Sequence, residues 1–243
     1  MPFRGQLFSL GRVAAGLSAA AIVVALVNCA SVPTSGRDGT VSGTISASPT
    51  TPMPVRARLS RITLLAAAQG TYIDQVLLDR DSTIERWAPR VMTPLRIWID
   101  SSDVIAGAQA GFPAAVRAAF AEWESTGIPL RVQYVSSPGD ADIRVRWIEH
   151  LNHKTGSTTW RTDRGGWMLA GDITLATHIS DGQPLDGRGM RAIALHETGH
   201  ALGLSHSKDP GDVMAALVHV DGISVTDRNT IRLIYSTPAG PVR

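Results

Sequence analysis

The stretch from His196 to His206 reads HETGHALGLSH, and it is the strongest signal for fold and chemistry in the chain. It places His196 and His200 four positions apart, with Glu197 directly after the first histidine. On a helix, residues four apart share one face and lie about 6 Å apart along the axis. Two imidazoles so placed can bind one zinc ion, and the adjacent carboxylate can reach water at the metal without binding the metal itself.

Gly203 and His206 extend this pattern. A glycine three residues after His200 can adopt the left-handed conformation that ends a helix, and the chain can then return His206 to the same metal. Three histidine ligands leave a fourth coordination position for water, as in catalytic zinc sites. The sequence therefore predicts one catalytic Zn²⁺ held by these three histidines, with Glu197 as the general base.

A methionine, Met214, stands eight residues after His206, and Ser207 directly follows that histidine. With the histidine pattern, this resembles the zinc-binding motif and Met-turn of the metzincins, and the spacing is similar to the matrixins, the matrix-metalloproteinase branch. The resemblance implies a zinc-dependent endopeptidase with Met214 as an apolar floor under the ligands. It also implies a polypeptide substrate extended along an edge strand at Asp172–Thr177, with Gly166–Ala170 near the cleft.

Two features depart from the family pattern. Ala216 replaces the proline usually found two residues after the matrixin methionine, which affects the wall of the S1′ pocket. No cysteine stands just before the catalytic domain, so the family's cysteine-switch latency is absent.

The additional metal sites of vertebrate matrixins have no clear counterpart in the spacing of this sequence. Calcium is therefore unsupported, and we interpret His219 as a surface residue. Five further residues are interpreted as solvated polar side chains: His150, His153, Asp163, Asp172 and His178.

Hydrophobic patterning predicts an α+β fold, because strands and helices do not alternate strictly. The resemblance adds that the sheet is twisted, mostly parallel and of four to five strands, with long helices that include the active-site helix and a C-terminal helix. The expected strands are Pro94–Asp100, Pro129–Val135, Asp142–Trp147 and Asp172–Thr177. The expected helices are Leu59–Ala68, Pro113 to Gly127, Met190–Leu202 and Thr226–Tyr235.

The composition excludes several classes of protein. Of 243 residues, 44% are hydrophobic and 18% are charged, which is typical of a globular chain. The net charge is +2 with no basic stripe, so no nucleic-acid partner is expected. Cys29 is the single cysteine, which excludes a disulfide framework within the chain and a cysteine-ligated zinc finger.

The N-terminus resembles a bacterial-type export signal. Arg4 and Arg12 precede the uncharged apolar run Val13–Val27. As a helix this run would span about 22 Å, less than the roughly 30 Å of a bilayer's hydrocarbon core. The protein is therefore expected to be exported, either secreted or anchored at the outer face of the membrane.

Three alternatives remain for this signal. Cys29 follows the apolar run as in a lipoprotein signal, where the cysteine becomes acylated, although Asn28 departs from that pattern. The other two are plain secretion with cleavage near Ala30, and an uncleaved anchor over Val13–Val32. Membrane contact is thus expected only through an N-terminal lipid or an uncleaved signal.

The sequence divides into five parts. They are a signal peptide (1–30), a Ser/Thr/Pro/Gly-rich flexible linker (31–58), an extension that is either a pro-segment or part of the domain (59–86), the catalytic domain (87–237) and a tail (238–243).

Two other functions compete with a general peptidase. One is a non-catalytic, membrane-tethered zinc protein that acts as a binding module, and the other is a peptidase with a single cell-envelope target. Glu197 favours an enzyme, because a pure binding site has no use for a carboxylate at that position.

Overall fold

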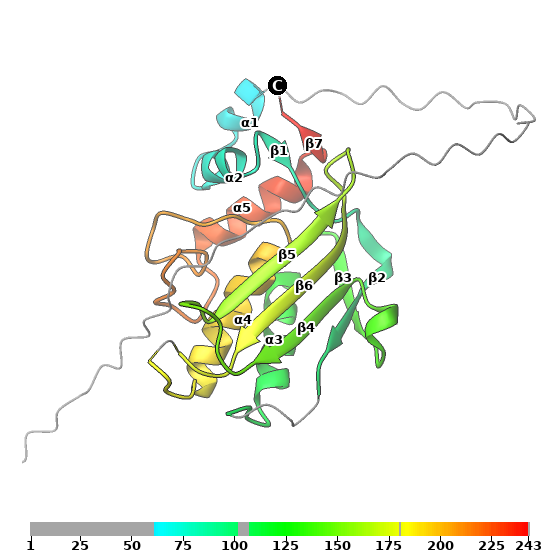
Figure 1. The fold of residues 1–243 in the computed structure, drawn as a ribbon. Helices are drawn as coiled ribbons and strands as arrows, with labels where there is room; N and C mark the ends of the chain where they lie inside the picture. Colours follow the sequence, from blue (N-terminus) through cyan, green and yellow to red (C-terminus); the bar gives the residue numbers. More distant parts are fainter. Residues whose placement is uncertain (1–60, 102–106, 180, 243) are drawn as a thin grey trace, which may run out of the picture.

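The computed structural model describes residues 61–101, 107–179 and 181–242 (Figure 1). The predicted signal peptide and linker, including Cys29, lie outside these residues. Among the helices of the described ranges, none has both the length and the apolar character that crossing a bilayer requires.

A five-stranded sheet forms the centre of the fold, in the order β3-β2-β4-β6-β5 (Figure 1). The pairs β2–β3, β2–β4 and β4–β6 are parallel, and β5 pairs antiparallel with β6. The strands are β2 (Arg90–Ile99), β3 (Leu130–Tyr134), β4 (Ile143–Ile148), β5 (Gly156–Thr162) and β6 (Met168–Ala176). The prediction of an α+β fold with a mostly parallel sheet is confirmed.

The outer strand of this sheet differs from the expectation. The assignment of the edge to Asp172–Thr177 is wrong, because β6 pairs with β4 on one side and with β5 on the other. The edge on this side of the sheet is β5, a strand that the sequence interpretation missed, and β3 forms the opposite edge. Its alternation is nevertheless regular, since Thr158 and Trp160 are buried while Thr159 between them is exposed.

The helices α3 (Phe112–Glu124) and α4 (Gly187–Ala201) lie side by side against one face of the sheet (Figure 1). Two buried tryptophans fix α4 in place. The indole of Trp123 donates to the Leu195 carbonyl at 2.9 Å, and that of Trp87 donates to the Ala201 carbonyl at 2.8 Å. Both ends of the segment that carries the histidines are thereby anchored to other parts of the core.

The C-terminal helix α5 (Val225–Ser236) begins at a capping box. The Ser224 hydroxyl accepts from the Asp227 amide, and the Asp227 carboxylate accepts from the Ser224 amide. This reciprocal pairing satisfies amide groups that the first turn of a helix otherwise leaves without partners. A single 3₁₀ turn, η1 (Pro138–Asp140), precedes β4.

The N-terminal described residues belong to the same core. They form α1 (Arg61–Ala66), α2 (Ile73–Asp79) and β1 (Thr83–Ile84), and β1 pairs antiparallel with β7 (Gly240–Pro241) near the C-terminus (Figure 1). Three side chains of α2 are completely buried or nearly so, namely Ile73, Val76 and Leu77. Buried residues of the single core therefore lie on both sides of the range 87–237.

Candidate functional site

The chain reverses direction directly after α4, at Gly203. This glycine has a φ of +115°, and a Cβ built on it would lie 2.6 Å from the carbonyl oxygen of Glu85. Only glycine combines that conformation with so close an approach of another backbone. The reversal returns His206 toward the helix, as the sequence predicts.

Arg80, from the segment before β1, supports the returning loop. Its guanidinium donates to the Leu204 carbonyl at 2.9 Å and to the Ser205 hydroxyl at 3.2 Å. The same group pairs with Glu85 at 2.9 Å. The N-terminal segment therefore holds the two residues that precede His206.

The three predicted ligands converge. The ring centroids of His196 and His200 are 4.6 Å apart, those of His200 and His206 are 4.8 Å apart, and those of His196 and His206 are 5.4 Å apart. One ring nitrogen from each lies within 4.8 Å of those of the other two. His196 and His200 are each only 1% exposed, whereas His206 is half-buried.

The tautomers of His196 and His200 follow from their partners. The Nδ1 atom of His196 lies 2.8 Å from the Val213 carbonyl oxygen. The Nδ1 atom of His200 lies 2.9 Å from the Leu204 carbonyl oxygen. A carbonyl can only accept, so each Nδ1 carries the proton and each Nε2 presents a lone pair. The two Nε2 atoms are 3.0 Å apart.

This arrangement fits a metal ion. Two lone pairs facing each other at that separation repel, and a cation shared between them removes the repulsion. In addition, the Nε2 of His206 is buried without a hydrogen-bond partner. The donor set of three imidazoles therefore suits zinc, which is the cofactor that the resemblance implies.

Burial keeps these imidazoles neutral. It lowers the pKa of His196 to about 3 and lowers that of His200 well below the ordinary range. The pKa of His206 is also lowered, again mainly by burial. Neutral imidazole is the form of histidine that binds metals.

One carboxylate oxygen of Glu197 accepts a hydrogen bond, and the other has no hydrogen-bond partner. The Thr158 hydroxyl on β5 donates to Oε2 at 2.6 Å, whereas Oε1 is buried without a hydrogen-bond partner. A Cβ built on Gly156 would lie 2.3 Å from Oε1, so this glycine makes room for the carboxylate. Burial raises the pKa of Glu197 to about 8, against the lowering effects of the Thr158 hydrogen bond and of nearby Lys154.

Met214 lies directly against α4, next to Gly199 between His196 and His200. Its side chain is fully buried, and a Cβ built on Gly199 would lie 2.3 Å from its sulfur. The Ser207 amide donates to the Met214 carbonyl at 2.8 Å, which closes the loop between them. An apolar side chain therefore lies beneath the helix segment that carries His196 and His200.

Sequence reasoning missed Asp227 as a support for this loop. Its Oδ2 accepts from the Val213 amide at 2.9 Å and from the Ser224 amide at 3.0 Å, and its Oδ1 accepts from the Tyr72 hydroxyl at 3.0 Å. The Val213 carbonyl in turn orients His196. The pattern Ser-x-x-Asp at the start of α5 was the available signal.

Thr158, Gly156 and Lys154 were missed for a different reason. They lie on β5 or just before it, and the strand was not recognised. The alternation of Thr158 and Trp160 with exposed residues was the signal that could have identified it.

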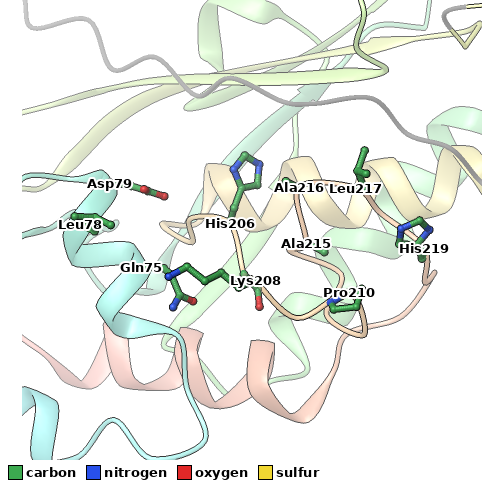
Figure 2. Close-up of a pocket in the computed structure, with 11 residues that line it drawn as sticks. Gln75, Leu78, Asp79, His206, Lys208, Pro210, Ala215, Ala216, Leu217 and His219 are labelled. Atoms are coloured by element: carbon green, nitrogen blue, oxygen red, sulfur yellow. The ribbon is translucent and has the colours of Figure 1, made fainter.

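A hollow of about 490 Å³ lies beside His206 (Figure 2). Leu78 and Asp79 of α2 line it on one side, and Ala216 and Leu217 line it on another. His219, which is exposed as predicted, also borders this hollow. The site is therefore open to large ligands on the side of its third histidine.

The other residues that were interpreted as solvated separate into two sets. Asp172 pairs with Arg146 at 3.1 Å and with Arg144 at 3.4 Å, and Asp163 accepts from amides within its own turn. His150, His153 and His178 instead line one hollow of about 210 Å³.

Comparisons with known proteins agree with this geometry. The profile of the family described as Matrixin matches residues 95–236. A probable matrix metalloproteinase 095L of Invertebrate iridescent virus 3 is 38% identical over 111 residues, which cover 40% of this chain and 29% of that protein. Matrix metalloproteinase-15 of Homo sapiens is 31% identical over 154 residues, which cover 52% of this chain and 22% of that protein.

A third relative, the interstitial collagenase of Equus caballus, is 28% identical over 138 residues, covering 53% of this chain and 29% of that protein. The chain thus spans less than a third of the length of each of these relatives.

Proposed function

The chain belongs to the matrixin family of zinc metalloendopeptidases, and on that premise we propose that it hydrolyses peptide bonds with Glu197 as general base. The observation that carries the proposal is the convergence of three imidazoles, two of them buried and one half-buried, beside a buried carboxylate with an unpaired oxygen.

His196, His200 and His206 would hold the zinc through their Nε2 atoms. Bound zinc supplies Lewis acidity, which activates water and polarises a peptide carbonyl. The Val213 and Leu204 carbonyls keep two of the rings in the required tautomer. Met214 would shape the floor of the site without binding the metal.

Glu197 would move the proton. The Thr158 hydroxyl occupies Oε2, so Oε1 is the atom that is free to accept a proton from the attacking water. The carboxyl protonated in this way would pass that proton on to the leaving amine. The same residue thus acts first as base and then as acid.

The substrate would be a polypeptide in extended conformation. β5 is the edge strand next to Glu197, and an extended peptide can add to an exposed edge through main-chain hydrogen bonds. The hollow beside His206 supports room for a substrate side chain there.

We further propose that the substrates are extracytoplasmic. The support is the sequence alone, namely Arg4 and Arg12 before the apolar run Val13–Val27. Mass spectrometry of the N-terminal peptide, from protein isolated from its native host, tests this proposal. Acylation at Cys29 or cleavage near Ala30 is expected, and an intact N-terminus in a protein recovered from the cytoplasm would contradict export.

The central experiment is cleavage of a randomised peptide library by the purified chain. Cleavage is expected, with loss on treatment with a zinc chelator and return when Zn²⁺ is added. Cleavage that persists in a sample shown by metal analysis to contain no zinc would refute the proposal.

A further inference from the structure

A largely buried ion pair in the N-terminal segment contacts two different elements of the candidate site. Arg80 follows α2 and Glu85 follows β1, and their side chains pair at 2.9 Å. The side chain of Arg80 is 4% exposed and that of Glu85 is 14% exposed. Both residues come before the range 95–236 that the Matrixin profile matches, so the matched family region does not include the pair.

Arg80 contacts the loop that carries the third histidine. Its Nη2 donates to the Leu204 carbonyl at 2.9 Å, and its Nε donates to the Ser205 hydroxyl at 3.2 Å. These are the two residues directly before His206. Because the guanidinium is planar and its donors have a fixed geometry, simultaneous contacts of this kind hold the loop in one position.

The Leu204 carbonyl also accepts a hydrogen bond from a second group. The Nδ1 of His200 lies 2.9 Å from the same oxygen. Hydrogen-bond partners of this kind orient a metal-binding histidine and fix its tautomer. Arg80 therefore acts on two of the three histidines, on His200 through the shared carbonyl and on His206 through the backbone that precedes it.

Glu85 contacts the edge strand β5. The Trp160 indole donates to Oε2 of Glu85 at 2.9 Å, and the Thr162 hydroxyl donates to Oε1 at 3.4 Å. The guanidinium carbon of Arg80 lies 4.4 Å from the centroid of the Trp160 ring, which adds a cation–π contact. Both members of the ion pair therefore contact this strand.

The same strand orients the candidate base. Thr158 stands two residues before Trp160 on β5, and its hydroxyl donates to Glu197 at 2.6 Å. A shift of β5 against the loop that carries His206 would change how this carboxylate faces the three imidazoles. An ion pair that contacts both elements prevents such a shift.

We propose that Arg80 and Glu85 are positioning residues, which hold the histidine loop and β5 in the geometry needed for zinc binding and peptide cleavage. This inference rests on the proposed peptidase function. It also makes the segment 61–86 a permanent part of the catalytic domain and not a removable pro-segment, because removal would take Arg80 away from the Leu204 carbonyl.

The test separates positioning from general stability with two variants of the full chain. Arg80→Met keeps a long side chain beside Trp160 but removes every guanidinium donor, and it leaves Glu85 without its charged partner. The double variant Arg80→Met, Glu85→Gln removes that unpaired charge as well. Loss of one partner of a buried pair strongly destabilises a protein, whereas replacement of both is often close to neutral.

Stability and zinc affinity should therefore respond differently. The unfolding midpoint in the presence of a chelator should fall in Arg80→Met and recover by more than half in the double variant. The zinc affinity, measured by competition with a chelator of known affinity, should fall about tenfold or more in both variants, since neither restores a donor to the Leu204 carbonyl. The double variant carries the test where Arg80→Met does not fold.

Two further measurements report the geometry of the site. The visible absorption of the protein loaded with Co²⁺ should change in both variants, because it depends on how the ligands surround the ion. In peptide cleavage, kcat should fall about tenfold or more while KM changes little, since misplaced reacting groups slow the reaction more than they weaken substrate binding.

Arg61→Met is the matched control. Arg61 belongs to the same N-terminal segment, and its guanidinium donates to the Ser82 hydroxyl at 3.1 Å in an exposed contact. This variant loses the same charge without a change at the loop or at β5. It should leave the zinc affinity, the Co²⁺ spectrum and kcat unchanged.

Three results would overturn the inference. One is a zinc affinity in Arg80→Met within about twofold of that of the unaltered protein. Another is recovery of zinc affinity together with stability in the double variant, because the pair would then serve folding alone. The third is an equal loss in Arg61→Met. These metal readouts need no substrate, so an unaltered protein that binds zinc but cleaves no peptide would contradict only the proposed function.

Discussion

The two histidine groups of this protein differ in how their geometry is maintained. In the triad, two rings are 1% exposed, and backbone carbonyls accept from their Nδ1 atoms. In the group of Glu149, His150 and His178, two side chains are 53% exposed, and only His178 has a fixed partner, the Thr177 hydroxyl. The comparison shows that burial and backbone partners preform the triad, whereas exposed side chains keep their freedom to rotate.

This difference has an energetic basis. Burying neutral imidazoles whose Nε2 atoms face each other disfavours the metal-free protein, because those lone pairs lack partners. Exposed side chains are solvated by water, so the metal-free state costs little there. The triad should therefore bind zinc much more tightly than the second group.

The largest expected effect separates peptide cleavage from zinc binding at the triad. Glu197→Gln keeps an oxygen that can accept from Thr158 but removes the base, so peptide cleavage should fall about 100-fold or more. Zinc content should stay unchanged, and metal analysis with a kinetic assay measures both. Full turnover in this variant would exclude Glu197 as the base.

The next effect compares one histidine from each of the two groups. His206→Ala should lower the zinc affinity of the triad by about 100-fold or more. Loss of a residue that only hydrogen-bonds to a metal ligand already lowers metal affinity by about 10- to 100-fold, and loss of a ligand should cost at least as much. His150→Ala should leave that affinity unchanged. Competition with a chelator of known affinity measures both variants, and equal losses would show that the groups are one coupled site.

A smaller effect tests the support of the triad loop. Asp227→Ala leaves the Val213 and Ser224 amides and the Tyr72 hydroxyl without their acceptor, so unfolding free energy should drop by about 1–3 kcal/mol or more. Denaturant unfolding measures this. Thr226→Ala is the control, because Thr226 is next to Asp227 and its half-buried side chain makes no hydrogen bond within the described residues. An equal loss there would contradict the assignment.

The smallest effect is expected at the exposed group. Without added metal, His150→Ala should change the unfolding free energy by no more than about 0.5 kcal/mol, because the side chain is exposed. A large loss in chelator would show that His150 packs structurally and would weaken the contrast between the groups.

Sequence and structure agree best where the pattern is local. The helix that carries His196 and His200, the reversal at Gly203 and the return of His206 all depend on residues within one short stretch. The core strands β2, β4 and β6 were predicted from alternation. The strand β5 was missed, although Thr158 and Trp160 alternate with exposed residues, because threonine-rich alternation is a weaker signal than an apolar one.

The sequence by itself determined that His196 and His200 share one face of α4, since residues four apart on a helix lie one above the other. Only the tertiary structure decided that β5 is the edge, that Thr158 holds Glu197, and that Glu149 and His150 meet His178. These contacts join residues far apart in the chain. They form because β4, β6 and β5 pair in that order, and the order of strands in a sheet depends on the packing of the whole core.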